Sequence, residues 1–299
     1  MQAMTAPRPR TRVPGVHYVV TGDAPRTIVL LHGYTDNVTT WQRVVPVLAA
    51  SHRVIAIDLP GFGASSRPWS TPLLSGYVDV VREVLDAEGV DGPVSLMGNS
   101  MGAAVSTLFG ARYPERTDGM VLIDMPGMRG VPQLWRLGLS RPAELAVRAA
   151  LRCVPSRTAQ FGLGWVYSHI AVARPRDLDP SVRRGFCDPY ALRDSVAGLM
   201  PIGRALVREL RSADLGGLVA RSEAPALVVF GARDVLTPAR VLRRIGRPGG
   251  AVVLPGCGHC PQIDQPAALL SEVLPFLRAS RAEHRAADHE EISRTARSA

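Results

Sequence analysis

The sequence contains no lysine, few cysteines and few aromatic residues, and it has no long apolar run. All 35 basic residues among its 299 are arginine. Four cysteines are too few for a disulfide framework in a chain of this length, which favours a reducing compartment. No run of 18 apolar residues occurs, so no membrane-spanning helix is expected. Residues 1–15 lack the apolar stretch of a secretory signal peptide. We therefore expect a cytoplasmic protein with no membrane insertion.

The composition and charge exclude several further classes of protein. With 46% hydrophobic and 20% charged residues, the chain is neither disordered nor fibrous. Its formal net charge is +9. However, the arginines are spread along the whole chain, whereas nucleic-acid-binding proteins gather basic residues on one face. We interpret the arginine excess as compositional bias and expect no nucleic-acid partner.

Short apolar runs alternate with helix-length amphipathic segments through the first 125 residues. This alternation predicts βαβ units and therefore an α/β fold, with a mainly parallel sheet covered by helices on both faces. The predicted strands are 16–21, 27–31, 53–57, 94–97 and 120–123, and the predicted helices are 40–49, 73–86 and 101–112.

The rhythm breaks at about residue 126 and resumes at about residue 223. The intervening segment has helical patterns at 142–152, 190–199 and 203–210, and few strand-like runs. The strands 226–230 and 251–254 and the helices 238–245 and 267–278 follow it. We therefore expect a flexible N-terminal tail (1–15), a core domain (16–125 and 223–279), a helical insertion (126–222) and a flexible C-terminal tail (280–299).

The strongest local signal is Gly98-Asn99-Ser100-Met101-Gly102, a G-x-S-x-G motif between a predicted strand and a predicted helix. In a nucleophile elbow the serine occupies a strained turn there, and the flanking glycines leave room for neighbouring backbone. The alternative is a glycine-rich turn in which the serine caps the helix.

A serine hydroxyl needs a general base, usually a histidine oriented by a carboxylate. Asp234 follows the predicted strand 226–230, and His259 follows the predicted strand 251–254. The carboxyl ends of parallel strands gather active-site groups, so Ser100, Asp234 and His259 are expected at one sheet edge. Taken singly, Asp234 could cap a helix and His259 could be an ordinary loop residue.

Acyl transfer also needs backbone donors for the oxygen that becomes negatively charged. His32-Gly33-Tyr34 follows the predicted strand 27–31. We expect the amides of Tyr34 and Met101 to be these donors, with Gly33 allowing the turn and His32 supporting the loop. An ordinary glycine turn is the alternative.

These motifs resemble the α/β-hydrolase fold family. The resemblance rests on LLHGY (30–34), DLPGFG (58–63), GNSMG (98–102), GARD (231–234) and GCGH (256–259). It implies an eight-stranded, mostly parallel sheet with a helical cap inserted after the sixth strand. It also implies Ser100 as nucleophile, Asp234 as orienting acid, His259 as base, Tyr34 and Met101 as oxyanion donors, and no cofactor.

Two other acidic residues and one cysteine motif need separate interpretation. Asp58 is expected to shape its loop by accepting hydrogen bonds from backbone amides. Asp124 ends the strand at which some family members carry the acid, so it is the alternative to Asp234. Cys257 and Cys260 form a C-x-x-C pattern, but their place near the chain end argues against redox catalysis, and no second ligand pair suggests a metal site.

The elbow is also similar to that of hydrolases that cleave carbon–carbon bonds in ring-opened aromatic metabolites. Two features differ from those enzymes: the loop Tyr34-Thr35-Asp36-Asn37 is not rich in glycine and proline, and Cys260 replaces an aromatic residue. The first hypothesis is therefore hydrolysis of a carboxylic ester with a small or medium apolar group, bound partly by apolar cap residues. Carbon–carbon hydrolysis and ligand sensing without turnover are the alternatives.

Overall fold

One mixed sheet forms the centre of the molecule. The computed structural model describes residues 8–10, 12–127, 131–187, 193–239 and 251–279. The strand order is β1-β2-β4-β3-β5-β6-β7-β8. Strands β3, β4, β5, β6, β7 and β8 are parallel to one another, and β1 and β2 form antiparallel pairs at one edge. The strands are β1 (Arg8–Arg10), β2 (Tyr18–Thr21), β3 (Thr27–Leu31), β4 (Arg53–Ile57), β5 (Val94–Asn99), β6 (Thr117–Ile123), β7 (Ala226–Gly231) and β8 (Ala251–Leu254).

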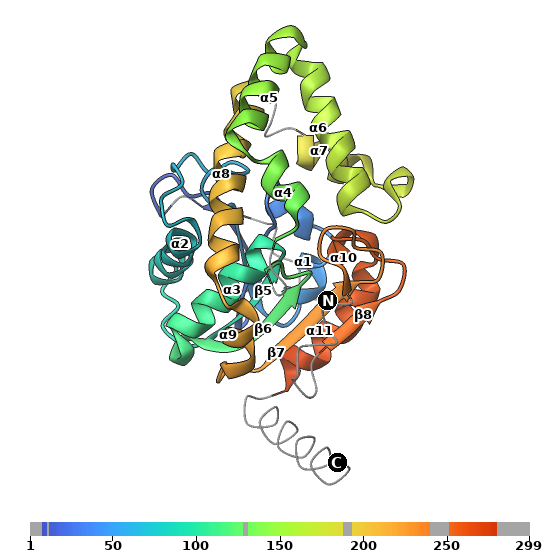
Figure 1. The fold of residues 1–299 in the computed structure, drawn as a ribbon. Coiled ribbons are helices and arrows are strands. Elements are labelled where there is room, and N and C mark those ends of the chain that lie inside the picture. The colour runs from blue at the N-terminus through green and yellow to red at the C-terminus, as the bar shows by residue number, and fades with distance from the viewer. Residues whose placement is uncertain (1–7, 11, 128–130, 188–192, 240–250, 280–299) are drawn as a thin grey trace, which may run out of the picture.

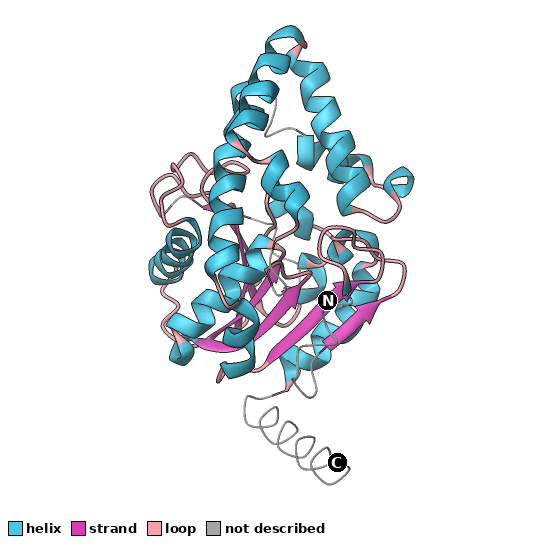
Figure 2. Ribbon diagram, viewed as in Figure 1, coloured by secondary structure: helices cyan, strands magenta, loops and turns pink. Residues whose placement is uncertain are grey.

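Helices cover both faces of this sheet, as the sequence predicts (Figures 1 and 2). In β3, Ile28 and Leu30 join the apolar core under α1 and α11, whereas Val29 and Leu31 join the core under α2, α3 and α9. A strand buried on both faces has no polar side to present, which explains its unbroken apolar sequence. These helices are α1 (Val45–Leu48), α2 (Leu73–Ala87), α3 (Met101–Arg112), α9 (Leu215–Arg221), α10 (Pro261–Asp264) and α11 (Pro266–Arg278), with 3₁₀ turns η1 (Val38–Trp41) and η2 (Pro114–Arg116).

The N-terminal segment differs from the prediction of a flexible tail, because residues 8–10 form β1. This strand pairs with β2 through backbone groups, with Arg8 opposite Val20. Backbone pairing does not need an apolar pattern, and proline is tolerated on an edge strand, so Pro9 does not prevent it. Seven strands occupy the predicted ranges, and only this three-residue strand brings the sheet to eight.

Between β6 and β7 the described chain is helical. In Figure 1 this insertion rises above the sheet, with α5 and α6 at its tip. Its contacts with the core include hydrogen bonds from Tyr34 Oη to the Leu199 carbonyl (2.8 Å) and from Asn37 Nδ2 to the Gly185 carbonyl (2.7 Å). The helices are α4 (Gln133–Gly138), α5 (Arg141–Cys153), α6 (Ser156–Ala171), α7 (Pro180–Cys187) and α8 (Arg193–Ser212), with the 3₁₀ turn η3 (Pro175–Asp177).

Three of the predicted helices are wrong in extent. The predicted helix 40–49 is interrupted into η1 and α1, because Pro46 lacks the amide that a continuous helix needs and suits the first turn of α1. The predicted helices 190–199 and 203–210 are joined in α8, which contains Pro201. Most of the predicted helix 238–245 and the predicted tail 280–299 lie outside the described residues. In the described part of the chain, no helix combines the length and apolarity needed to cross a bilayer.

Candidate active site

Ser100 lies at a sharp turn between β5 and α3. Its backbone has φ 52° and ψ −114°, a left-handed conformation that is rare for a residue with a side chain. The residue is 6% exposed. Such strain survives only where the surroundings impose it, and it is the local geometry that a nucleophile elbow requires.

The flanking glycines make this turn possible through close backbone approach. A Cβ atom on Gly98 would overlap the backbone of Gly102, and a Cβ atom on Gly102 would overlap the carbonyl group of Leu31. Neither position has room for a methyl group. The glycines of the motif are therefore needed for the packing of α3 against β3 and β5.

His259 and Asp234 lie together at the carboxyl-end edge of the sheet, in the loops after β8 and β7. His259 Nδ1 and Asp234 Oδ2 are 2.8 Å apart and hydrogen-bonded, and both residues are buried. Thr237 Oγ1 also donates to Asp234 Oδ2, and the Leu236 amide donates to Oδ1 at 2.7 Å. Burial raises the pKa of Asp234, but the His259 charge and these hydrogen bonds outweigh it and hold the pKa well below its ordinary value. Asp234 is therefore a carboxylate that faces the imidazole ring.

Asn99 joins the histidine loop to the elbow. Its Nδ2 donates to the carbonyl oxygen of His259 at 2.9 Å, and its Oδ1 lies 3.7 Å from the Cys260 thiol. Ser100 is the next residue along the chain. Among the described residues, Ser100 Oγ and His259 Nε2 form no hydrogen bond with each other. Such bonds are often long before substrate binds and shorten only in the complex.

The two amides predicted as oxyanion donors are unengaged. Within the described part of the chain, neither the Tyr34 amide nor the Met101 amide donates a hydrogen bond. The Met101 amide is at the first position of α3, and Tyr34 follows Gly33 in the turn after β3. A Cβ atom on Gly33 would lie 3.4 Å from Ser100 Cβ, so this turn passes directly beside the elbow. Both amides thus keep an unused hydrogen-bond donor near Ser100.

His32 supports the Tyr34 turn from beneath. Its Nε2 accepts a hydrogen bond from the Leu59 amide at 3.0 Å, and Nδ1 lies 2.7 Å from the Gly33 carbonyl oxygen. Burial lowers the pKa of His32, which is fully enclosed. The neutral ring with its proton on Nδ1 satisfies both partners at once. His32 therefore ties the turn to the loop after β4.

Asp58 occupies that same loop after β4 and acts as predicted from the sequence. Its carboxylate accepts hydrogen bonds from the amides of Val38 (2.7 Å) and Ala64 (2.8 Å), and its Oδ2 is 2.7 Å from His17 Nδ1. These bonds hold the loops around η1 rather than directing a charge toward Ser100.

Asp124, the alternative acid, does not contact the imidazole through a hydrogen bond. Its Oδ1 accepts from the Gly231 amide at 3.0 Å, and its Oδ2 is buried without a hydrogen-bond partner. Ligand-type atoms of Asp124, Asp234 and His259 nevertheless all lie within 4.8 Å of one another. Two ionised carboxylates at this separation would repel by roughly 3 to 4 kcal/mol at an effective dielectric constant of ~20.

This cluster is also the one group of potential metal ligands among the described residues. Two of its atoms are already engaged in hydrogen bonds, because His259 Nδ1 bonds to Asp234 and Asp124 Oδ1 accepts from an amide.

The C-x-x-C cysteines are both free and buried, and burial raises the pKa of the Cys257 thiol to about 12. A thiol with that pKa carries little thiolate at neutral pH, so it is a poor redox nucleophile.

Sequence reasoning did not find three residues that shape this site. Asn99 was visible within the G-x-S-x-G motif, but its type is not specified there. Thr237 lies three residues after Asp234 and belongs to none of the motifs in the sequence. Tyr167 of α6 donates to Asp36 Oδ2 at 3.1 Å, a contact between the insertion and the Tyr34 loop. No sequence pattern connects residues that lie 131 positions apart.

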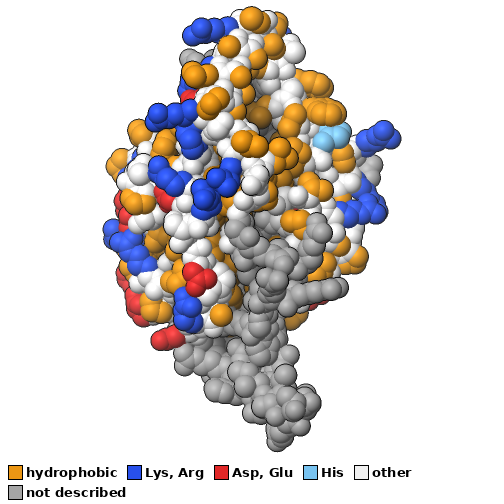
Figure 3. Space-filling view, in the orientation of Figure 1, with side chains coloured by type: hydrophobic (Ala, Val, Ile, Leu, Met, Phe, Trp, Pro, Cys, Tyr) orange, Lys and Arg blue, Asp and Glu red, His pale blue; other side chains and the backbone are white. Residues whose placement is uncertain are grey.

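The insertion exposes many of its apolar side chains. Figure 3 shows them over the helices at the top of the molecule. Trp165 is 54% exposed and stacks on His169, with ring centroids 4.1 Å apart. The other large apolar side chains exposed there are Leu134, Leu137, Leu145, Phe161, Val166 and Ile170. These exposed side chains therefore do not belong to the apolar core of this chain.

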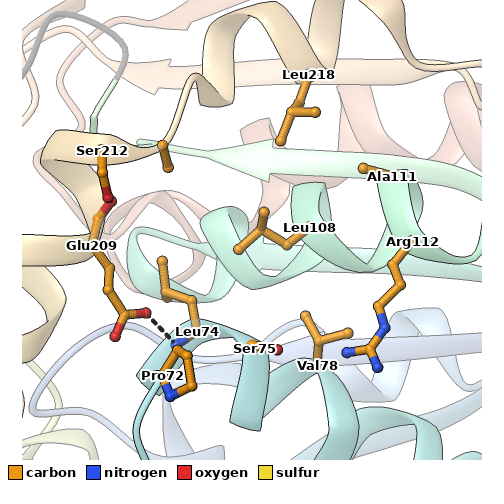
Figure 4. A pocket seen from close by; sticks show the side chains of 11 residues that line it. Pro72, Leu74, Ser75, Val78, Leu108, Ala111, Arg112, Glu209, Ser212 and Leu218 are labelled. Atoms are coloured by element: carbon orange, nitrogen blue, oxygen red, sulfur yellow. Dashed lines mark hydrogen bonds between the residues drawn. The ribbon is translucent and has the colours of Figure 1, made fainter.

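A separate pocket of about 460 Å³ lies between α2, α3, α8 and α9 (Figure 4). Leu74, Leu108 and Leu218 line its apolar part, and Glu209 lies at one end. The Glu209 carboxylate accepts hydrogen bonds from the Leu73 and Leu74 amides at the start of α2. None of the candidate catalytic residues lines this pocket, so we assign it to helix packing.

Comparison with known proteins identifies the class to which this fold and elbow belong. The model of the family described as "Alpha/beta hydrolase family" matches residues 28–272. The chain therefore belongs to the alpha/beta hydrolase family. It is 30% identical to a 2-hydroxy-6-oxo-2,4-heptadienoate hydrolase of Pseudomonas putida, over 86% of this chain and 90% of that protein. It is 27% identical to a pimeloyl-[acyl-carrier protein] methyl ester esterase of Edwardsiella ictaluri, over 85% and 94%.

Other similarities cover less of the relative or show the fold alone. The chain is 28% identical to the dihydrolipoyllysine-residue acetyltransferase component of an acetoin cleaving system of Pseudomonas putida, and it spans 65% of that protein's length. Among solved structures, Cfl2 from Burkholderia cenocepacia superimposes with a TM-score of 0.74 at 24% identity, over 91% of this chain and 95% of that one.

Proposed function

We propose that this protein is a serine hydrolase that cleaves a carboxylic ester carrying a small or medium apolar group. The observation that carries the proposal is the arrangement of the buried Asp234–His259 pair, in which the His259 carbonyl accepts a hydrogen bond from Asn99, the residue that precedes Ser100. A hydroxyl at a strained elbow, an imidazole and a carboxylate in this relation are the groups that acyl transfer requires.

The proposed reaction has two steps. Ser100 Oγ attacks the ester carbonyl carbon while His259 Nε2 takes the hydroxyl proton, and His259 then gives that proton to the leaving alcohol. A water molecule, deprotonated by the same imidazole, hydrolyses the acyl-enzyme and releases the acid. Asp234 holds Nδ1–H and balances the positive charge on the ring during both steps. No cofactor is needed for these two reaction steps.

The Tyr34 and Met101 amides would bind the oxygen that becomes negative in each tetrahedral intermediate. Both amides lack a hydrogen-bond acceptor in the described chain, and one of them is at the N-terminus of α3. Preorganised donors of this kind contribute about 3 to 4 kcal/mol each, because they need no reorientation during the reaction.

The proposal is tested with p-nitrophenyl acetate, p-nitrophenyl butyrate and a fluorophosphonate probe. We expect multiple turnovers of at least one ester and covalent labelling by the probe, both lost in Ser100→Ala. The variant Ser106→Ala is the control, because Ser106 is also buried in α3 but donates only to the Gly102 carbonyl. Turnover that survives in Ser100→Ala would contradict the assignment.

Carbon–carbon hydrolysis is a second candidate, supported by the 30% identity to a 2-hydroxy-6-oxo-2,4-heptadienoate hydrolase. A vinylogous dienoic keto acid tests it, since cleavage removes the visible absorbance of this substrate. Ligand sensing without turnover is the third candidate. It predicts a single labelling event at Ser100 with no turnover of any ester or keto acid in the screen.

A further inference from the structure

The Asp124 carboxyl group has no part in the proposed reaction, yet it is fully buried beside the residues that carry it. Its backbone is fixed, since Asp124 has φ 47° and its amide donates to the Val229 carbonyl at 2.8 Å. Its Oδ1 is paired with the Gly231 amide, whereas its Oδ2 has no hydrogen-bond partner. A buried, unpaired carboxyl oxygen needs an explanation, because leaving it unsatisfied is costly.

The surroundings of Asp124 contain acidic groups and no arginine partner. Asp234 faces it from the loop after β7, Cys257, His259 and Cys260 face it from the loop after β8, and Asp264 lies in α10. In the described part of the chain, no arginine forms an ion pair with Asp124, and His259 already pairs with Asp234. An ionised Asp124 would therefore be a second negative charge without a cation of its own.

We propose that Asp124 is a positioning residue that keeps its proton and donates it from Oδ2, as a hydrogen bond, to the Asp234 carboxylate. The inference rests on the serine-hydrolase function proposed above. Asp234 has room for this bond. A carboxylate offers about four acceptor positions, and Leu236, Thr237 and His259 occupy three. Burial, followed by the Asp234 charge, raises the pKa of Asp124 well above its ordinary value, which agrees with this geometry.

The consequence for catalysis is that neutral donors from Leu236, Thr237 and Asp124 bind the Asp234 carboxylate together with His259. They keep Asp234 ionised and fix its orientation toward Nδ1 of the imidazole. Two neighbouring carboxyl groups whose environments separate their protonation states in this way can serve different roles. Asp234 is then the charged partner of the imidazole, and Asp124 is the neutral group that holds it.

The first test needs no turnover and is made on the Ser100→Ala background. Because Asp36 also keeps part of its proton at neutral pH, Asp36→Asn is added to this background. At neutral pH we then expect an infrared C=O band of a protonated carboxylic acid that disappears in Asp124→Asn and persists in the surface control Asp118→Asn. We also expect the midpoint of the His259 imidazole titration, followed by NMR, to change by less than about half a unit in Asp124→Asn, because one neutral donor replaces another.

Two results would overturn the proposal. One is the absence of the Asp124-dependent acid band at neutral pH. The other is a fall of about one unit or more in the His259 midpoint on Asp124→Asn, which would show that the wild-type protein carries a negative charge at residue 124. Both results are independent of whether the protein hydrolyses an ester, so they separate this inference from the proposed function.

The second test compares two variants in turnover. Asp124→Asn keeps an acceptor for Gly231 and a donor for Asp234, so kcat should stay within about threefold of the wild-type value. Asp124→Ala removes both and should lower kcat by about tenfold or more with little change in KM. Equal losses in the two folded variants would contradict the proposal. If Asp124→Ala does not fold, the infrared band and the Asp124→Asn comparison decide the matter.

Discussion

At the scale of single residues, the candidate site depends on which of two carboxyl groups, Asp234 or Asp124, is hydrogen-bonded to the His259 imidazole. His259 Nδ1 is hydrogen-bonded to Asp234, whereas Asp124 lies within 4.8 Å of both residues and forms no hydrogen bond with the ring. Replacing Asp234 with asparagine removes the negative charge and favours the wrong tautomer of the imidazole. We expect Asp234→Asn to lower kcat by about 10³- to 10⁴-fold with p-nitrophenyl butyrate as substrate.

The control for this prediction is Asp118→Asn, because Asp118 pairs with Arg26 at the surface. A near-normal kcat in Asp234→Asn would assign the acid role to Asp124 instead.

The sequence pointed to Ser100, Asp234 and His259 because each follows a strand that is easy to recognise. It could not supply Thr237 or the Asn99 link, since their roles depend on the loop geometry that brings β5, β7 and β8 to one edge.

At the scale of elements, α8 stabilises the start of α2. The residue before α2 is Pro72, whose side chain cannot accept a hydrogen bond, and the Glu209 carboxylate takes that role from α8 (Figure 4). We expect Glu209→Ala to lower the free energy of unfolding by about 1 to 3 kcal/mol, because two amides at the helix start lose a charged acceptor.

Urea unfolding measures this effect. Glu209→Gln should give a smaller loss, since the amide retains one acceptor oxygen, and Glu115→Ala provides an exposed control. A Glu209→Ala variant as stable as the wild type would show that solvent replaces the carboxylate without cost.

The elements themselves were predictable to very different extents. The ranges 27–31, 53–57 and 251–254 coincide with β3, β4 and β8, because strands buried on both faces are uniformly apolar and end at turn residues. In the insertion the apolar pattern is a weaker guide. The single helix α8 was predicted as two, since Pro201 disfavours helix locally while packing against α2, α5 and α6 maintains it.

At the scale of the whole molecule, Asp36 lies where the insertion meets the core. Burial raises its pKa to about 7, and its carboxylate accepts hydrogen bonds from the Asn37 amide and the Tyr167 hydroxyl. The folded protein therefore keeps a proton that the unfolded chain releases at lower pH. Stability should fall as pH rises from about 4 to about 7, by up to ~4 kcal/mol from this residue, and should stay reduced above that window.

Asp36→Asn tests this dependence, because the amide is uncharged at every pH. We expect the variant to be more stable than the wild type at pH 8 and similar to it at pH 4, as measured by urea unfolding at both values. An equal loss of stability at both pH values would mean that the carboxyl group matters only for packing.

Tyr167→Phe should shift the pH dependence of stability in the other direction. It removes a hydrogen bond that lowers the pKa of Asp36, so the decline in stability should continue to higher pH than in the wild type.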